Sequence, residues 1–216
     1  MNTNLTSPDP GSTLVPMKRV LVACEFSAIV RDAFRARGFD AWSCDTLPTE
    51  GDPAWHYECD IFDVLGLGWD LMIAHPPCTY LANSGNKHLY LGMKKENGRD
   101  PERWRLMADG AAFFSALLNA PIEHIAVENP IMSPYGREII GRPQDQVVQP
   151  WQFGHGETKA TCFWLKNLPK LVPTNIVEGR EARVHMMSPG PQRWYERSRT
   201  FHGIASAMAD QWGAAL

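Results

Sequence analysis

Two reactive side chains follow apolar segments of the chain, fifty residues apart. Cys78 comes after the apolar residues 71–74 and the pair Pro76 and Pro77, and Glu128 ends the apolar residues 125–127. Short apolar runs of this kind are typical of buried strands. Ligands bind at the carboxyl ends of strands in open α/β sheets, so we expect both side chains to face one pocket. A thiolate there is a nucleophile once its surroundings activate it.

Two other interpretations of these residues stay open. A free cysteine is most often a small buried hydrophobe, and this applies to Cys78 as to any single cysteine. His75 could be a base beside Cys78 in a hydrolase, but no oxyanion-hole or triad pattern accompanies it.

The elements that must position these residues alternate along the chain. Ser27 is expected to cap a helix that Gly38 ends, and Asp100 with Pro101 opens a second helix. The strands are predicted at residues 19–24, 40–44, a segment ending near 59–60, 69–74, 122–127, 146–151 and 160–165, with a last helix at 201–212. This alternation predicts an α/β fold, with a doubly wound, mostly parallel sheet covered by helices on both faces.

Composition limits the class of protein. The 216 residues suit one domain, predicted at 17–216, after a polar, disordered tail at 1–16. Five cysteines without a CxxC pair indicate reduced thiols, a cytoplasmic location and no metal site. No run approaches the roughly 18 apolar residues of a membrane span. The net charge of −3 means that any nucleic-acid binding must rest on local basic clusters.

The order of these signals resembles the cytosine-5 DNA methyltransferases, as a short relative of phage or prophage type acting in a bacterial or phage-infected cell. The resemblance rests on Pro77-Cys78 after the fourth strand and Glu128-Asn129 after the fifth, and it covers roughly residues 18–165 and the last helix. It implies a Rossmann-like, S-adenosylmethionine-dependent methyltransferase fold. It also implies methyl transfer to carbon 5 of cytosine.

The resemblance implies roles for the catalytic residues. Cys78 would add to carbon 6 of cytosine, with Pro77 beside the substrate, and Glu128 would hydrogen-bond the N3 and amine of the base. Asn129 would hold the turn that aims Glu128. Lys159 stands where the family has one of two arginines and would contact the base carbonyl or a phosphate.

It also implies a cofactor site. The loop of Cys24, Glu25, Phe26 and Ser27 would surround S-adenosylmethionine, with backbone N–H groups of residues 27–29 receiving its carboxylate. This loop lacks the glycines that the family uses for close approach. The remaining cofactor residues would be Asp45 for the ribose, Asp60 for the adenine, and Pro76. The alternative for each acid is an ordinary solvated or loop-capping role.

The later part of the chain departs from the family. Only 35 residues, 166–200, separate the last predicted strand from the last helix, too few for the family's large target-recognition domain. This segment still carries a basic and aromatic cluster suited to phosphate contact and base stacking. Its members are Arg180, Arg183, His185, Arg193, Trp194, Tyr195, Arg197 and Arg199, of which Arg193, Arg197 and Arg199 are predicted to bind substrate. A solvated surface loop is the alternative.

Three functions follow as hypotheses. DNA is the first expected substrate, modified with S-adenosylmethionine as methyl donor. A free deoxycytidine nucleotide or very short single strand is the second, because the recognition region is short. A catalytically silent relative that binds nucleic acid or another partner is the third. The sequence predicts no oligomeric state.

Overall fold

The computed structural model describes residues 16–188, 190 and 193–216, without the side chains of His185 and Trp194. The predicted tail, residues 1–16, therefore lies outside the described residues apart from Pro16. The parts that His185 and Trp194 would play in the basic cluster lie outside them as well.

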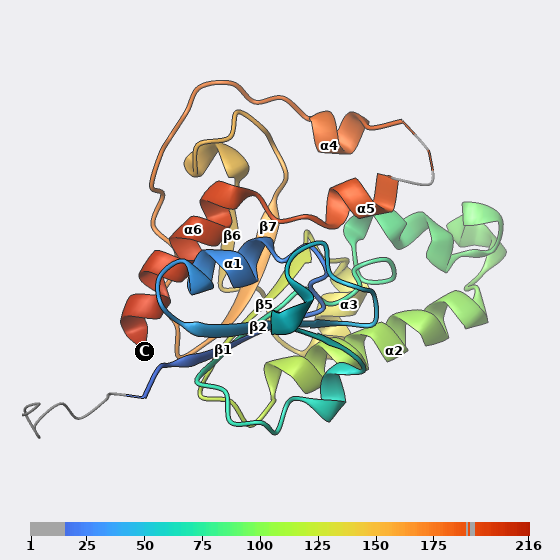
Figure 1. Ribbon diagram of the computed structural model, residues 1–216. Coiled ribbons are helices and arrows are strands. Elements are labelled where there is room, and N and C mark those ends of the chain that lie inside the picture. The colour runs from blue at the N-terminus through green and yellow to red at the C-terminus, as the bar shows by residue number, and fades with distance from the viewer. Residues whose placement is uncertain (1–15, 189, 191–192) are drawn as a thin grey trace, which may run out of the picture.

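Within the described residues, seven strands form one sheet in the order β3-β2-β1-β4-β5-β7-β6 (Figure 1). Strands β1 to β5 run parallel, whereas β7 is antiparallel to both β5 and β6. The prediction of a doubly wound, mostly parallel, Rossmann-like sheet is confirmed. The strands are β1 (Arg19–Ala23), β2 (Asp40–Asp45), β3 (His56–Glu58), β4 (Leu71–Ala74), β5 (His124–Pro130), β6 (Gln146–Val148) and β7 (Thr161–Lys166).

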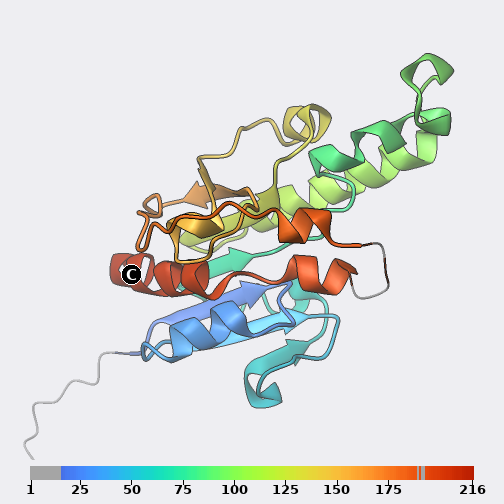
Figure 2. The same cartoon turned by 90° about the horizontal axis from the view of Figure 1, so that it is seen from above.

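Helices cover both faces of the sheet. Helices α1 and α6 lie side by side on one face, and α2 covers the other (Figures 1 and 2). The helices are α1 (Ile29–Arg35), α2 (Pro101–Leu118), α3 (Pro134–Ile140), α4 (Arg183–Met186), α5 (Arg193–Ser198) and α6 (His202–Gln211). Short 3₁₀ helices span Pro53–Trp55, Ile61–Asp63, Asn83–Leu89, Leu91–Met93, Lys95–Asn97, Pro150–Gln152 and Gly213–Ala215. In the part of the chain that the structure describes, no helix has the length and apolar character needed to cross a membrane.

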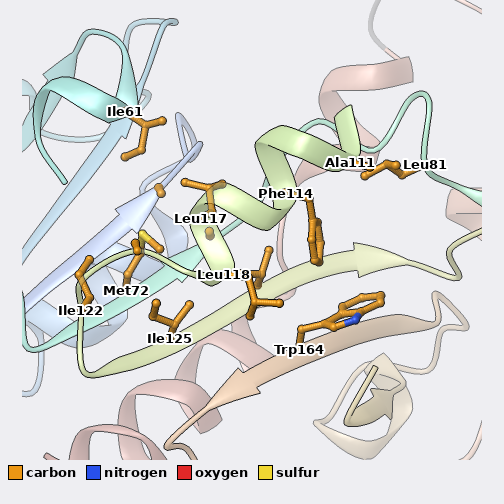
Figure 3. Packing of buried hydrophobic residues seen from close by; sticks show 14 of the residues in the cluster. Ile61, Met72, Leu81, Ala111, Phe114, Leu117, Leu118, Ile122, Ile125 and Trp164 are labelled. Carbon is orange, nitrogen blue, oxygen red and sulfur yellow. The ribbon is translucent and has the colours of Figure 1, made fainter. Parts of the chain in front are cut away.

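The core forms because β1 is apolar on both of its sides. Val20 and Val22 face α1 and α6, whereas Leu21 and Ala23 face α2, and all four are fully buried. On the α2 side, Phe114 meets Trp164 of β7 edge to face, with ring centroids 5.0 Å apart (Figure 3). Each fully buried aromatic or leucine side chain contributes about 1.5–3 kcal/mol to folding. Both faces therefore hold the sheet rigidly.

The local differences from the predicted elements have simple causes. The strand predicted at 146–151 ends at Val148, because Pro150 begins a 3₁₀ turn. The connections on either side of β3 are 3₁₀ turns rather than helices. Helix α3 was not predicted, although Ser133 caps it through the N–H of Gly136 at 2.9 Å. Helix α2 begins as predicted, with Asp100 as its cap.

The register of the sheet decides which residues meet at its carboxyl edge. Ala74 of β4 pairs with Ala23 of β1 and with Val127 of β5. The next residues along the three strands, Cys24, His75 and Glu128, therefore lie side by side at the carboxyl edge of β1 and β4. The strand order reverses between β1 and β4, and ligands bind at such a switch point.

Gly203 at the start of α6 has no room for a side chain. A Cβ atom there would lie 1.8 Å from the backbone oxygen of Phe153. We expect Gly203→Ala to lower the free energy of unfolding by about 3 kcal/mol or more, measured by urea denaturation. Gly110→Ala in α2 is the control, because its Cβ would come no closer than 3.7 Å to Leu81. That change should stabilise the protein by about 0.5–1 kcal/mol, and equal effects of both would refute this account of Gly203.

Candidate active site

Cys78 lies in a tight turn behind β4. Its carbonyl oxygen accepts hydrogen bonds from the N–H groups of Leu81 and Ala82, at 3.1 and 2.9 Å. Burial raises the pKa of its thiol, and the nearby charge of Glu128 raises it further, whereas Lys159 and Arg197 act to lower it. Cys78 is therefore close to Glu128 and Lys159, two residues predicted for the site. Its raised pKa means that the thiol is protonated at neutral pH.

Glu128 lies within β5, beside His75. Its Oε2 lies 3.2 Å from Nδ1 of His75, and only 16% of its side chain is exposed. Burial acts to raise the pKa of this carboxyl, but the hydrogen bond and charge of His75, together with Lys159, outweigh it and lower the pKa. The carboxyl group of Glu128 is therefore ionised at neutral pH.

Lys159 completes the cluster from the loop that precedes β7. Its Nζ donates to the carbonyl oxygens of Arg197 and Arg199, at 2.7 and 3.1 Å. Burial lowers the pKa of Lys159, and the charges of Glu128 and Cys78 act to raise it. The structure thus brings Cys78, Glu128 and Lys159 within electrostatic reach of one another.

Asn129 lies in a different setting from the one predicted. The turn expected at Asn129 and Pro130 is absent, because both residues belong to β5 and pair with Cys162 and Thr161 of β7. Asn129 is fully buried, and its Nδ2 donates to the carbonyl oxygen of Pro130 at 2.8 Å. The strand itself, rather than a turn, directs Glu128.

The space beside Glu128 is very small. A cavity of about 10 Å³ is lined by residues that include His75, Glu128, Lys159, Thr161 and Phe201. This volume suits one water molecule. A pyrimidine ring needs far more room than this cavity provides.

The loop after β1 uses its own carboxylate to start α1. The side chain of Glu25 accepts hydrogen bonds from the N–H groups of Val30 at 2.7 Å and Arg31 at 3.2 Å. Ser27, predicted to cap this helix, instead precedes the N-cap residue Ala28. It donates to Glu25 and accepts a long bond from Ile29. Glu25 therefore binds the N–H groups of Val30 and Arg31, which are not the N–H groups of residues 27–29 predicted to receive the cofactor's carboxylate.

This loop adopts glycine-like conformations without glycine. Cys24 and Ala28 both have left-handed backbone angles, with φ of 57° and 61°. Phe26 is buried, and the ring of Tyr195 in α5 stacks on it with centroids 4.9 Å apart. The conformation expected from a glycine-rich loop is thus present, with an aromatic cover.

The predicted acids gather at the ends of β2 and β3. Asp45 and Asp60 both lie near Cys24, whose pKa is raised to about 12, chiefly by burial and then by these two charges. Burial also raises the pKa of Asp45, against the N–H of Leu47 that its carboxylate accepts at 3.0 Å. Asp60 accepts the N–H of Phe62 at 3.0 Å and thereby caps a 3₁₀ turn.

The two prolines before Cys78 differ in exposure. Pro76 is buried at the carboxyl edge, whereas Pro77 is exposed. The roles predicted for Pro76 toward the cofactor and for Pro77 toward the substrate stay predictions.

The predicted basic cluster divides into two groups. Arg180 stacks on Trp151, and Arg183 pairs with the buried Glu157, whose charge also acts on the pKa of Lys159. Arg197 lies within electrostatic reach of Cys78, and Arg199 pairs with Glu50 at 2.5 Å. Of the three predicted substrate residues, Arg193 begins α5, and it has contacts of its own.

A larger cleft lies next to this edge. It has a volume of about 430 Å³ and is lined by residues that include Ser27, Asp32, Glu50, Arg199 and His202. Ser27 is the predicted cofactor residue that lines it. Across the described ranges, no three His, Cys, Asp or Glu side chains are grouped to hold a metal ion.

His75 is the site residue that sequence reasoning assigned to a different chemistry. It was considered as a base for Cys78, but its Nδ1 contacts Glu128 instead. The position of His75 in the sequence could have indicated this contact. His75 directly follows Ala74 of β4, which pairs with Val127 of β5, so it must neighbour Glu128.

No protein-family model and no curated protein matches the sequence. A solved structure described as a DNA modification methyltransferase encoded within an E. coli prophage matches with a TM-score of 0.42 and 15% identity. The match covers 74% of this chain and 52% of that one. The Entamoeba histolytica methyltransferase EhMeth matches with a TM-score of 0.43 and 14% identity, over 81% of this chain and 61% of that one. The matches thus span about half to three fifths of those proteins, and likeness at this level carries no function over.

The left-handed conformation of Ala28 generates a stability prediction. A non-glycine residue in this conformation costs about 1–2 kcal/mol, and glycine loses about 0.5–1 kcal/mol in a regular position. We expect Ala28→Gly to raise the melting temperature by about 1–3 °C. Ala33→Gly, the same change inside α1, should lower it. A fall in both variants would show that Ala28 is unstrained.

The charge of Glu128 should control the reactivity of Cys78. Removing it by Glu128→Gln lowers the pKa of the thiol, so more thiolate is present at pH 8. We expect iodoacetamide to alkylate Cys78 roughly three- to tenfold faster in this variant. Mass spectrometry of the peptide that carries Cys78 separates it from the other four cysteines. Glu123→Gln, an exposed charge before β5, should leave the rate unchanged. An unchanged rate in Glu128→Gln would place the two residues in separate sites.

Proposed function

We propose that this protein transfers a methyl group from S-adenosylmethionine to carbon 5 of cytosine, with Cys78 as nucleophile. The observation that supports the proposal most is the convergence of Cys78, Glu128 and Lys159 on one edge, where Glu128 and Lys159 act on the pKa of Cys78 and Lys159 also acts on the pKa of Glu128. The set contains a nucleophile, a carboxylate and a cation. Addition to a pyrimidine needs these three kinds of group.

The chemistry assigns a task to each residue. The Cys78 thiolate forms a bond to carbon 6 of cytosine, and the electron pair of the 5,6 double bond then makes carbon 5 nucleophilic. Glu128 hydrogen-bonds the N3 and the amine of the base, and its protonated form offsets the negative charge that develops on the ring. Carbon 5 would then form a bond to the sulfonium methyl group of S-adenosylmethionine, whose methyl–sulfur bond would break to leave a neutral thioether. Loss of the carbon-5 proton to solvent then expels the thiolate and restores the double bond.

Lys159 supports the thiolate that this reaction requires. Its ammonium group acts to lower the pKa of Cys78, in opposition to burial and Glu128. In the structure, Nζ of Lys159 donates to two backbone carbonyls, of Arg197 in α5 and of Arg199 just after it. The proposed reaction requires these two carbonyls to move away, so that Lys159 becomes available to the base carbonyl or a phosphate.

The residues fit part of the proposed cofactor. Asp45 is a half-buried carboxylate suited to two ribose hydroxyls, and Asp60 lies beside it for the adenine amine. Cys24, Phe26 and Pro76 supply apolar walls at the same edge. Bound here, S-adenosylmethionine supplies an electrophilic methyl group.

The methionine end of the cofactor would lie at the start of α1. Glu25 accepts the N–H groups of Val30 and Arg31 there, so the N–H groups of residues 27–29 remain the proposed partners of the cofactor's carboxylate. Arg199 lines the cleft beside Ser27 and offers a cationic group for the same carboxylate.

A free deoxycytidine nucleotide is the second candidate substrate. The observation that favours it is the compactness of residues 166–200, where the structure describes two short helices, α4 and α5, and one of these lies on the site. DNA remains the first candidate, and its base would have to leave the stack to reach Cys78.

Nucleoside mass spectrometry tests this function directly. The protein is incubated with S-adenosylmethionine and either unmethylated duplex DNA, a single-stranded oligonucleotide or deoxycytidine monophosphate. We expect 5-methyldeoxycytidine with wild type and with Cys59→Ser, a control cysteine outside the site. Cys78→Ser should give none, because the hydroxyl does not form the adduct. Product from Cys78→Ser, or no product from wild type on any of the three substrates, would contradict the proposal.

A further inference from the structure

His75 has a fixed hydrogen-bonding role at the carboxyl edge. Its Nδ1 lies 3.2 Å from Oε2 of Glu128, and the register of β4 and β5 places the two residues side by side. An ionised carboxylate only accepts hydrogen bonds, so Nδ1 must carry the proton of this contact. His75 is therefore the donor and Glu128 the acceptor.

The other ring nitrogen of His75 is buried at a polar cavity. Within the described structure, Nε2 is buried and has no hydrogen-bond partner. His75, Glu128, Lys159 and Thr161 all line the cavity of about 10 Å³, which suits one water molecule. Buried polar atoms without a protein partner are uncommon and are usually satisfied by water or used in function.

Charged groups from three other elements surround the imidazole. Glu128 comes from β5, Lys159 from the loop before β7, and Glu25 from the loop after β1. Burial raises the pKa of Glu25 and the imidazole acts to lower it, whereas at Glu128 the imidazole outweighs burial and the pKa is lowered. The side chain of Glu25 is in turn the group that caps α1. His75 thus lies between the carboxylate of the α1 cap and the carboxylate of the candidate catalytic site.

We propose that His75 is the positioning residue of this site, which aims the Glu128 carboxylate through Nδ1–H. The proposal rests on the proposed function, because it gives Glu128 its orientation toward the base. His75 itself touches neither the substrate nor the reacting atoms. Its contribution is to keep the Glu128 carboxylate in one direction.

Two substitutions separate donation from simple packing. His75→Asn keeps an N–H donor near the position of Nδ1, whereas His75→Leu fills similar space without any donor. In the Leu variant nothing replaces the imidazole against burial, so we expect the pKa of Glu128 to rise above the usual glutamate value of about 4.3. In wild type and in the Asn variant it should stay below that value.

Carbon-13 NMR of the full chain, labelled at the glutamate side-chain carboxyls, measures these titrations. The spectrum of Glu128→Gln identifies the Glu128 signal. A wild-type Glu128 that titrates at or above the usual value overturns the proposal, even if the Leu variant does not fold. Equal titration in the Leu variant and wild type also overturns it.

Steady-state kinetics adds a readout that a merely structural role would not give. We expect kcat to fall about ten- to hundredfold in His75→Leu, with the KM for S-adenosylmethionine within about twofold, and His75→Asn to recover most of kcat. Equal loss in both variants, or a change confined to KM, contradicts positioning by Nδ1–H. If wild type transfers no methyl group, the NMR titration still decides the role of His75, and only the proposed function fails.

Discussion

Buried carboxylates at the carboxyl edge of the sheet constrain the rest of this site. Glu25 is 4% exposed and the side chain of Glu128 is 16% exposed, so each must be stabilised largely by protein groups in place of water. An unpaired buried charge costs several kcal/mol. Glu25 therefore takes the N–H groups that open α1, and Glu128 takes the imidazole of His75 and the field of Lys159. These demands fix the conformation of the loop after β1 and the orientation of the groups around Cys78.

The sheet makes this arrangement possible because its central strands are parallel and in register. Ala23, Ala74 and Val127 pair across β1, β4 and β5, so the next residue of each strand reaches the same edge. Apolar side chains on both faces of β1 hold the strands against α1, α2 and α6. The tightly packed part of the sheet thus ends at the edge where the candidate site lies. The turn after β4, which carries Cys78, is held by the carbonyl of Cys78 and by a hydrogen bond from the N–H of Ser133 to the carbonyl of Leu81.

The sequence was most informative where local patterns are strong. The runs of β1 and β4 and the stripe of α2 predicted the sheet and its cover, and strand ends predicted where Cys78 and Glu128 would lie. The cap of α1 was predicted wrongly, because Ser27 has the local signature while Glu25 makes the bonds. The stacking of Tyr195 on Phe26 joins residues 169 positions apart, and no local pattern encodes such a contact. The roles of the individual site residues stay predictions.

One segment, α5 with the residues after it, contacts both the proposed cofactor side and the proposed base side of the site. In α5 and the residues after it, Tyr195 covers Phe26, Arg199 pairs with Glu50, and two carbonyls hold Lys159. The first two contacts belong to the proposed cofactor side and the third to the base side. A ligand that displaces the segment from either side therefore removes part of the barrier for the other. By linkage the two ligands would then bind with positive cooperativity, even though neither touches the other's residues.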